Sequence, residues 1–187
     1  FCQHHAGRTV WMVTDAPLAS SDGLTCIPAP EMTVFSITRC ANLGIRAAIA
    51  AGADIVCKTD IDCIITQDAA DFMAREIRQG RGAVFRYWGI AADAIGSGRE
   101  TLLPRIQGTC AMTAADWQRC DGYDERMDGY GFDDADIIRR AERAGIAMPV
   151  LRRPKIFHID HGEKHNRATC NPVRNTENVA IALGRTA

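Results

Sequence analysis

Short apolar runs alternate along the chain with longer amphipathic segments. The runs are rich in β-branched and aromatic residues, which is typical of strands; they span 9–13, 32–37, 54–58, 83–87, 108–112, 147–151 and 156–158. Segments with a helix-favouring composition or an apolar stripe predict helices; they span 39–51, 66–79, 133–144 and 175–183. The order strand, helix, strand over 32–58 implies two parallel strands joined by a crossover helix. The pattern therefore predicts the α/β class, with a mixed sheet flanked by helices.

Residues that favour helix ends stand at the borders of these segments. Thr66 precedes one helix as an N-cap, and Thr113 with Asp116 resembles the capping box of a further short helix. Glycine, which tolerates the left-handed conformation that ends many helices, follows three of the segments, at positions 52, 80 and 145.

The composition is that of one globular domain, which we expect to span 1–187. The chain has 187 residues, 47% of them hydrophobic and 24% charged. A formal net charge of −1 gives no general attraction to a phosphate backbone, so nucleic acid is not an expected partner. No apolar stretch approaches the roughly 20 residues that cross a bilayer, and residues 1–7 do not resemble a signal peptide. We therefore expect no transmembrane segment and a cytoplasmic location.

The eight cysteines contain no C-x-x-C pair, which argues against a zinc site built from thiolates. Several of them lie inside apolar runs, for example Cys57 and Cys110. A free cysteine in such a position behaves as a small buried hydrophobe, so reduced core thiols are expected.

Asp60-Ile61-Asp62 is the first candidate for chemistry, because it follows the predicted strand at 54–58. Residues two apart in an extended backbone point to the same side, so both carboxylates can approach one cation. Mg²⁺ and Mn²⁺ prefer such oxygen ligands and share their other positions with water and phosphates. The alternative is a solvated surface turn, which is the commoner meaning of this pattern.

A second candidate cluster follows the predicted strand at 156–158, with His158, Asp160 and His161. Imidazole together with a carboxylate pair suits manganese or another divalent transition ion. The alternative is an ordinary loop in which His158 is packed or bonded to backbone. Further basic residues follow in 164–174, where they could meet diphosphate oxygens or simply face water.

Asp133, Asp134 and Asp136 crowd the first turn of the helix predicted at 133–144. Complementarity to the helix dipole explains this charge order by itself. The other interpretation is that the glycine-containing turn at 129–131 presents a carboxylate to a cleft, where it takes a proton from an acceptor hydroxyl.

The order of these motifs resembles a known group of enzymes. The stretch 108–137, with Gly122-Tyr123-Asp124-Glu125, then Gly129-Tyr130-Gly131 and then Asp133-Asp134, closely resembles the C-terminal galactosyltransferase-type region of family 2 and family 7 glycosyltransferases. Upstream, Arg39 and Asn42 with Gly44 look like the helix that precedes the Asp-x-Asp motif in that group. The resemblance implies a GT-A-like (Rossmann-like) fold, here without the usual first strand and helix.

The resemblance also implies roles for single residues. Asp62, with or without Asp60, would bind the metal that accompanies the nucleotide, together with His161 and His158. Asp134 would be the general base and Asp133 would hold the acceptor, although the group more often has glutamate at that position. The remaining residues implied in substrate binding are Asp15, beside the nucleotide base, and Arg39, Asn42 and Asp60.

The activity that follows is metal-dependent, inverting transfer of a sugar from a nucleoside-diphosphate sugar, with uridine diphosphate expected first, to a hydroxyl of a saccharide or another acceptor. The expected cofactor is Mn²⁺ or Mg²⁺. Two alternatives remain at this point. One is a nucleotidyltransferase, which also uses paired carboxylates and a metal; the other is a non-catalytic relative that binds sugar or nucleotide.

Overall fold

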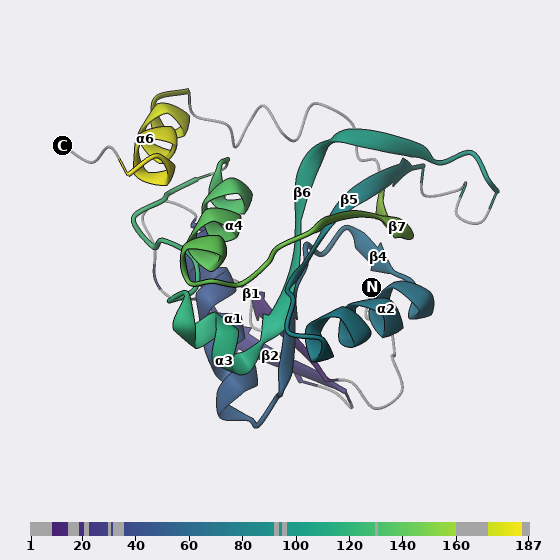
Figure 1. Ribbon diagram of the computed structural model, residues 1–187, viewed down its shortest axis with the longest axis horizontal. Helices are drawn as coiled ribbons and strands as arrows, with labels where there is room; N and C mark the ends of the chain where they lie inside the picture. Colours follow the sequence, from purple (N-terminus) through teal and green to yellow (C-terminus); the bar gives the residue numbers. More distant parts are fainter. Residues whose placement is uncertain are drawn as a thin grey trace.

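A computed structural model describes residues 9–14, 19–20, 23–29, 31, 36–91, 94, 97–129, 131–159 and 172–184. Its elements follow the predicted alternation of strands and helices and surround one central sheet (Figure 1). The fold is therefore of the mixed α/β class that the sequence predicts.

The central sheet has five strands in the order β3-β6-β5-β7-β4. Their bounds are β3 Ile55–Lys58, β4 Cys63–Ile65, β5 Ala83–Ile90, β6 Thr101–Thr113 and β7 Val150–Ile159. β5 and β7 are parallel, whereas the other three neighbouring pairs are antiparallel, so the sheet is mixed. A separate parallel pair is formed by β1 (Val10–Thr14) and β2 (Leu24–Pro28).

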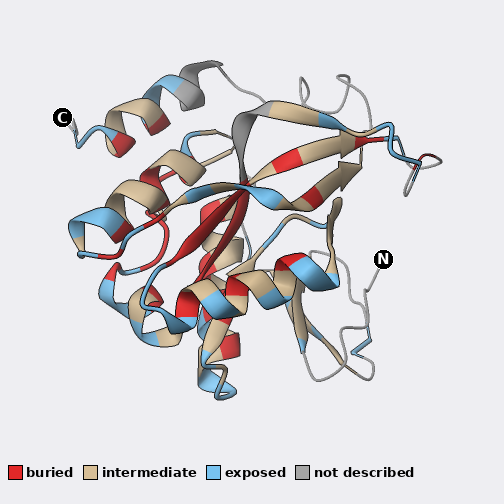
Figure 2. Cartoon of the chain, turned by 45° about the vertical axis from the view of Figure 1, so that its right-hand side comes forward, coloured by how far each residue is buried: buried red, intermediate tan, exposed pale blue. Residues whose placement is uncertain are grey.

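Helices cover both faces of the sheet (Figure 1). Their bounds are α1 Ile37–Ala50, α2 Gln67–Arg78, α3 Ala114–Arg119, α4 Asp133–Arg143 and α6 Pro172–Ala182. One core cluster joins α1, α3 and α4 to one face, and a second joins α2 to the other face. Buried residues consequently run along the central strands (Figure 2). This is why these strands are apolar at successive positions: Val84 packs in the first cluster and Phe85 in the second.

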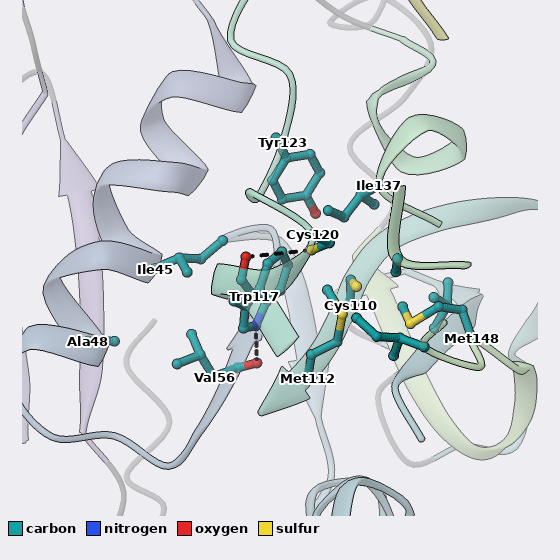
Figure 3. Close-up of a cluster of buried hydrophobic side chains, with 13 residues drawn as sticks. Ile45, Ala48, Val56, Cys110, Met112, Trp117, Cys120, Tyr123, Ile137 and Met148 are labelled. Atoms are coloured by element: carbon teal, nitrogen blue, oxygen red, sulfur yellow. Dashed lines mark hydrogen bonds between the residues drawn. The ribbon is translucent and has the colours of Figure 1, made fainter. Parts of the chain in front are cut away.

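Trp117 fixes the short helix α3 against the sheet. Its ring is almost completely buried, and its indole N–H donates to the carbonyl of Val56 over 3.0 Å (Figure 3). A buried indole needs such an acceptor, because an unpaired N–H would lose its hydrogen bond to water. The contact ties β3, which leads to the Asp-x-Asp turn, to the helix that follows β6.

The N-caps at Thr66 and Thr113 are confirmed, since their hydroxyls accept from the backbone N–H groups of Ala69 and Asp116. Gly52, Gly80 and Gly145 have positive φ angles after their helices, as expected.

The sequence interpretation differs from the structure at several places, which include the unexpected strand β2 and the start of β6 at Thr101 instead of Gly108. The two runs at 147–151 and 156–158 form one strand, β7, and the short strand β4 was not expected. β3 pairs antiparallel with β6 instead of joining a parallel neighbour through α1. The run at 32–37 ends in helix, because the hydroxyl of Ser36 accepts from the backbone of Arg39 and caps α1; positions 32–35 lie outside the described residues.

Among the described helices, none combines the length and the apolar composition that crossing a bilayer requires.

Candidate active site

Two acidic segments that are distant in sequence meet at Gly108. This residue lies on β6, between the turn after β3 and the first turn of α4. A Cβ atom placed on Gly108 would lie 2.6 Å from Lys58 Nζ, 2.9 Å from Asp60 Oδ2 and 3.2 Å from Asp134 Oδ1. Real Cβ atoms do not approach other atoms so closely, so the absent side chain allows an ammonium and two carboxylates to converge.

Lys58 is a member of this cluster that the sequence interpretation missed. Its side chain is 8% exposed, and its Nζ donates to Asp60 Oδ1 over 2.7 Å. Burial opposes the charge on Lys58, but Asp60, Asp134 and Asp133 together raise its pKa above the ordinary value. The cluster therefore holds a permanent positive charge among three carboxylates. A lysine ending an apolar strand just before Asp-x-Asp was the available signal, because buried lysines need a partner.

Asp133 and Asp134 begin α4 and carry altered proton affinities. Burial raises the pKa of Asp133, an effect that Lys58 opposes. Burial, with the neighbouring charge of Asp133, raises the pKa of Asp134 from 3.8 to about 7, although Lys58 pulls it down. A carboxylate with a pKa near neutrality can both accept and release a proton at physiological pH. This property exceeds what a helix-dipole cap needs.

The turn after β3 could hold a divalent cation. Asp60, Asp62 and Cys63 each offer an atom within 4.8 Å of the others. Burial raises the pKa of the Cys63 thiol well above its ordinary value, so in the metal-free protein the thiol is protonated and donates to Asp62 Oδ1 at 3.7 Å. The available charged donors are therefore carboxylate oxygens, which fit a hard ion such as Mg²⁺ or Mn²⁺.

His158 reaches the same turn from β7. Strand pairing sets it opposite Cys63, and its Nε2 lies 3.2 Å from Asp62 Oδ2. Its ring stacks on Tyr87, with centroids 5.7 Å apart. The structure thus brings His158 and Asp62 together, and this pair adds an imidazole donor that suits manganese. The other predicted ligand, His161, and the predicted base-binding Asp15 lie outside the described residues.

A buried chain of hydroxyls lies beneath the turn after β3. Thr109, which is fully buried on β6, makes hydrogen bonds to the hydroxyls of Thr59 and Tyr87, at 2.8 Å and 2.5 Å. Thr59 directly precedes Asp60. The chain therefore anchors the acidic turn to the sheet, which limits how far Asp60 can move.

Arg39 and Asn42 lie away from this cluster, on α1. Asn42 is buried: its amide donates to the carbonyl of Tyr123 and to Glu125, and its oxygen accepts from the backbone N–H of Tyr123, all at 2.9 Å. Arg39 donates to the carbonyl of Glu125 over 3.3 Å and pairs with Asp128 at 3.7 Å. Both residues thus hold the loop that leads from α3 to the acidic pair.

The same two residues also line an open, strongly charged pocket of about 750 Å³ between α1 and that loop. Four arginines and three acids line it. Three of the arginines pair with acids of the same pocket: Arg46 with Glu125, Arg126 with Asp124, and Arg140 with Asp121 and Asp124. Most of the positive charge there is therefore already paired.

One segment of the chain is similar to a known protein family. A family model described as the N-terminal domain of galactosyltransferase matches residues 104–162, a segment that contains Gly108, Asp133, Asp134 and His158. No curated protein matches the chain at a significant level.

Among solved structures, the catalytic domain of Drosophila beta1,4-galactosyltransferase 7, in complex with xylobiose, is similar with a TM-score of 0.56 and 12% sequence identity. The match covers 87% of this chain and 66% of that domain, so the chain spans slightly less than two thirds of its relative. The expected GT-A-like fold is confirmed, and residues 104–162 are similar to the galactosyltransferase family model.

Proposed function

We propose that the protein is a metal-dependent, inverting glycosyltransferase that moves a sugar from a nucleoside-diphosphate sugar, in the first place a uridine-diphosphate sugar, to a hydroxyl of a saccharide acceptor. The observation that carries the proposal is the meeting of Lys58, Asp60 and Asp134 at Gly108. It combines a carboxylate turn suited to a metal with a carboxylate suited to proton transfer. A glycosyl transfer needs both of these in one cleft.

Asp134 acts as the general base. With a pKa of about 7 it is largely ionised just above neutrality and still basic enough to take the proton of an attacking hydroxyl. The acceptor oxygen forms a bond to the anomeric carbon while the bond from that carbon to the diphosphate oxygen breaks, and the proton passes to Asp134. One displacement of this kind inverts the anomeric centre. Asp133, buried beside it, holds a second hydroxyl of the acceptor.

Asp62 and His158 would hold the cation, Mn²⁺ or Mg²⁺, with His161 as the further ligand that the resemblance implies. The cation would supply positive charge to neutralise the leaving diphosphate. Asp60 has one oxygen engaged by Lys58, so it orients the turn and contacts the donor through its other oxygen. The fixed ammonium of Lys58 also reduces the repulsion between three carboxylates and an incoming diphosphate. Asp15 meets the nucleotide base. Arg39 and Asn42 support substrate binding through the loop that they hold, which leads to Asp133 and Asp134.

The decisive experiment measures donor turnover with Mn²⁺ present. Release of uridine diphosphate from a panel of uridine-diphosphate sugars should rise when xylobiose is added as acceptor; the Drosophila domain, which was solved with that sugar, suggests this first choice. Asp134→Asn, which keeps the size of the side chain, serves as the matched control and should lose this stimulation. Release of pyrophosphate from a nucleoside triphosphate would indicate a nucleotidyltransferase. Binding without turnover would indicate a non-catalytic relative.

A further inference from the structure

Phe132 has a backbone conformation that its side chain disfavours. Its φ of 68° and ψ of −7° lie in the left-handed region, where a bulky residue is a true outlier. Phe132 stands directly at the start of α4, where its carbonyl accepts from the backbone N–H of Asp136 over 2.9 Å. Ser36 and Thr66 make the same bond in an extended conformation, so the bond alone does not demand the left-handed one. The side chain contributes nothing as an N-cap. Glycine would meet the same backbone requirement without strain, as Gly129 and Gly131 do in the same loop.

Burial does not compensate for this strain. Phe132 is 43% exposed, and it is one of four large apolar side chains exposed among the described residues, with Ile61, Val150 and Leu183. The other large aromatic rings of the core, such as Trp117 and Phe85, are at most 2% exposed. Packing within the fold therefore leaves a large part of Phe132 uncovered, unlike these core residues.

The position itself suggests the explanation. Phe132 directly precedes Asp133 and Asp134, so its Cα lies no more than about 7.6 Å from that of Asp134. The loop is held from outside: Asn178 of α6 donates to the carbonyls of Asp128 and Gly131, at 3.1 Å each. A strained residue held by its surroundings beside a proton-transfer group is typical of a functional site.

We propose that Phe132 is the platform against which the acceptor sugar lies, with the C–H face of a pyranose ring on the phenyl ring. This inference rests on the proposed function and deepens it. A pyranose whose hydroxyls are equatorial has two apolar C–H faces and a polar edge. The edge meets Asp133 and Asp134 while one face covers the exposed ring, which would remove apolar surface from water. The acceptor class is therefore a pyranoside, whose ring offers an apolar face, rather than an open-chain polyol.

The test compares the unaltered protein with Phe132→Gly, Phe132→Tyr and, as a control of matched exposure, Leu183→Ala. Saturation-transfer NMR with methyl β-xyloside measures sugar binding, and xylitol supplies the same hydroxyls without a ring face. Calorimetry with uridine diphosphate and Mn²⁺ measures the donor site independently. Thermal unfolding separates loss of the fold from loss of the platform.

Phe132→Gly should bind the xyloside about tenfold more weakly, while its melting temperature stays level or rises by about 2–4 °C because the strain is relieved. Phe132→Tyr and Leu183→Ala should bind as the unaltered protein does, and xylitol should not bind. Equal xyloside binding by Phe132→Gly overturns the inference, as does a clear fall in its melting temperature, which would mean that the ring supports the fold. Absence of uridine-diphosphate binding in all four proteins would instead contradict the proposed function.

Discussion

Lys58 Nζ donates to Asp60 Oδ1 over 2.7 Å, so the first carboxylate of the Asp-x-Asp turn is engaged by a buried ammonium of its own chain. The second carboxylate, Asp62, faces His158 instead. The two acids of the motif therefore have different environments, although they are only two residues apart. This difference leads to separate predictions for each.

Replacing Lys58 by methionine should destabilise the protein although the new side chain fits the space. Asp60, Asp133 and Asp134 would lose their common counter-charge. Breaking a fully buried ion pair costs about 3–5 kcal/mol, and because Asp60 is one-third exposed we expect about 2–3 kcal/mol. Urea unfolding at pH 7.5 measures the loss. Lys58→Arg keeps the charge and should recover most of it; equal stability of the methionine variant would show that the ammonium is not needed to balance the acids.

Gly108→Ala should disturb the same cluster by size alone. The new methyl group would stand within 3.2 Å of three polar side-chain atoms, so the ammonium and the carboxylates must move apart. We expect a loss of about 1–3 kcal/mol in the free energy of unfolding, together with lower activity. Gly44→Ala is the matched control, because its Cβ would meet Val13 at an ordinary 3.4 Å in the middle of α1. The Gly44→Ala variant should be as stable as the unaltered protein or slightly more stable. Similar losses of unfolding free energy in both variants would rule out a special role for Gly108.

Local patterns were sufficient to predict the helices. The caps at Thr66 and Thr113 and the apolar stripe of α4 depend on neighbouring residues only, so the sequence contains the whole signal. Sheet topology depends on partners distant in sequence. The antiparallel pairing of β3 with β6 and the continuity of β7 could not be predicted, because alternating apolar residues do not specify a partner strand.

The acidic residues of the candidate site could be predicted from the sequence, whereas its buried lysine, Lys58, could not. Asp62, His158 and Asp134 stand in recognisable motifs, and the structure brings His158 to Asp62 as expected. Lys58 is part of no motif, and its role became visible only when folding placed Gly108 and α4 beside it. For Asn42 the motif suggested substrate binding, which stays a prediction; the structure shows that it also bonds to the loop at Tyr123 and Glu125.

Donor binding should depend on the metal and on His158. In calorimetry, chelation should abolish or strongly weaken uridine-diphosphate binding, because Asp60, Asp62 and the diphosphate would otherwise bring like charges together. His158→Ala should weaken Mn²⁺-supported binding by about 10–100-fold with little change in melting temperature. Cys63→Ala should leave it unchanged, since burial keeps that thiol protonated. Equal affinity with and without chelator would contradict a shared metal, and a loss confined to Cys63→Ala would make the thiol the ligand.

Asp134 should make the metal-free protein less stable as the pH rises. Its folded-state pKa of about 7 lies above the value of about 3.9 in an unfolded chain. Its contribution to stability is therefore fully present below pH 4 and is lost as the pH rises through about 7. Asp134→Asn removes this titration, so the variant should exceed the unaltered protein by about 1–2 kcal/mol at pH 8 and not at pH 4. Urea unfolding at both pH values is the measurement, and a pH-independent difference would argue against the raised pKa.

The activity of Asp134→Asn should change in the opposite direction to its stability. As the proposed general base, Asp134 must be ionised, so kcat of the unaltered protein should rise with pH and level off above about 7. Asparagine keeps the size of the side chain but cannot accept the proton, so turnover should fall by roughly 10²–10⁴-fold while uridine-diphosphate binding with Mn²⁺ survives. Asp133→Asn, the same substitution at the neighbouring residue, serves as the matched control and should mainly raise the KM for the acceptor. If Asp134→Asn kept near-normal turnover at saturating donor and acceptor, the raised pKa would be a consequence of burial alone, and the acids that start α4 would serve only its dipole.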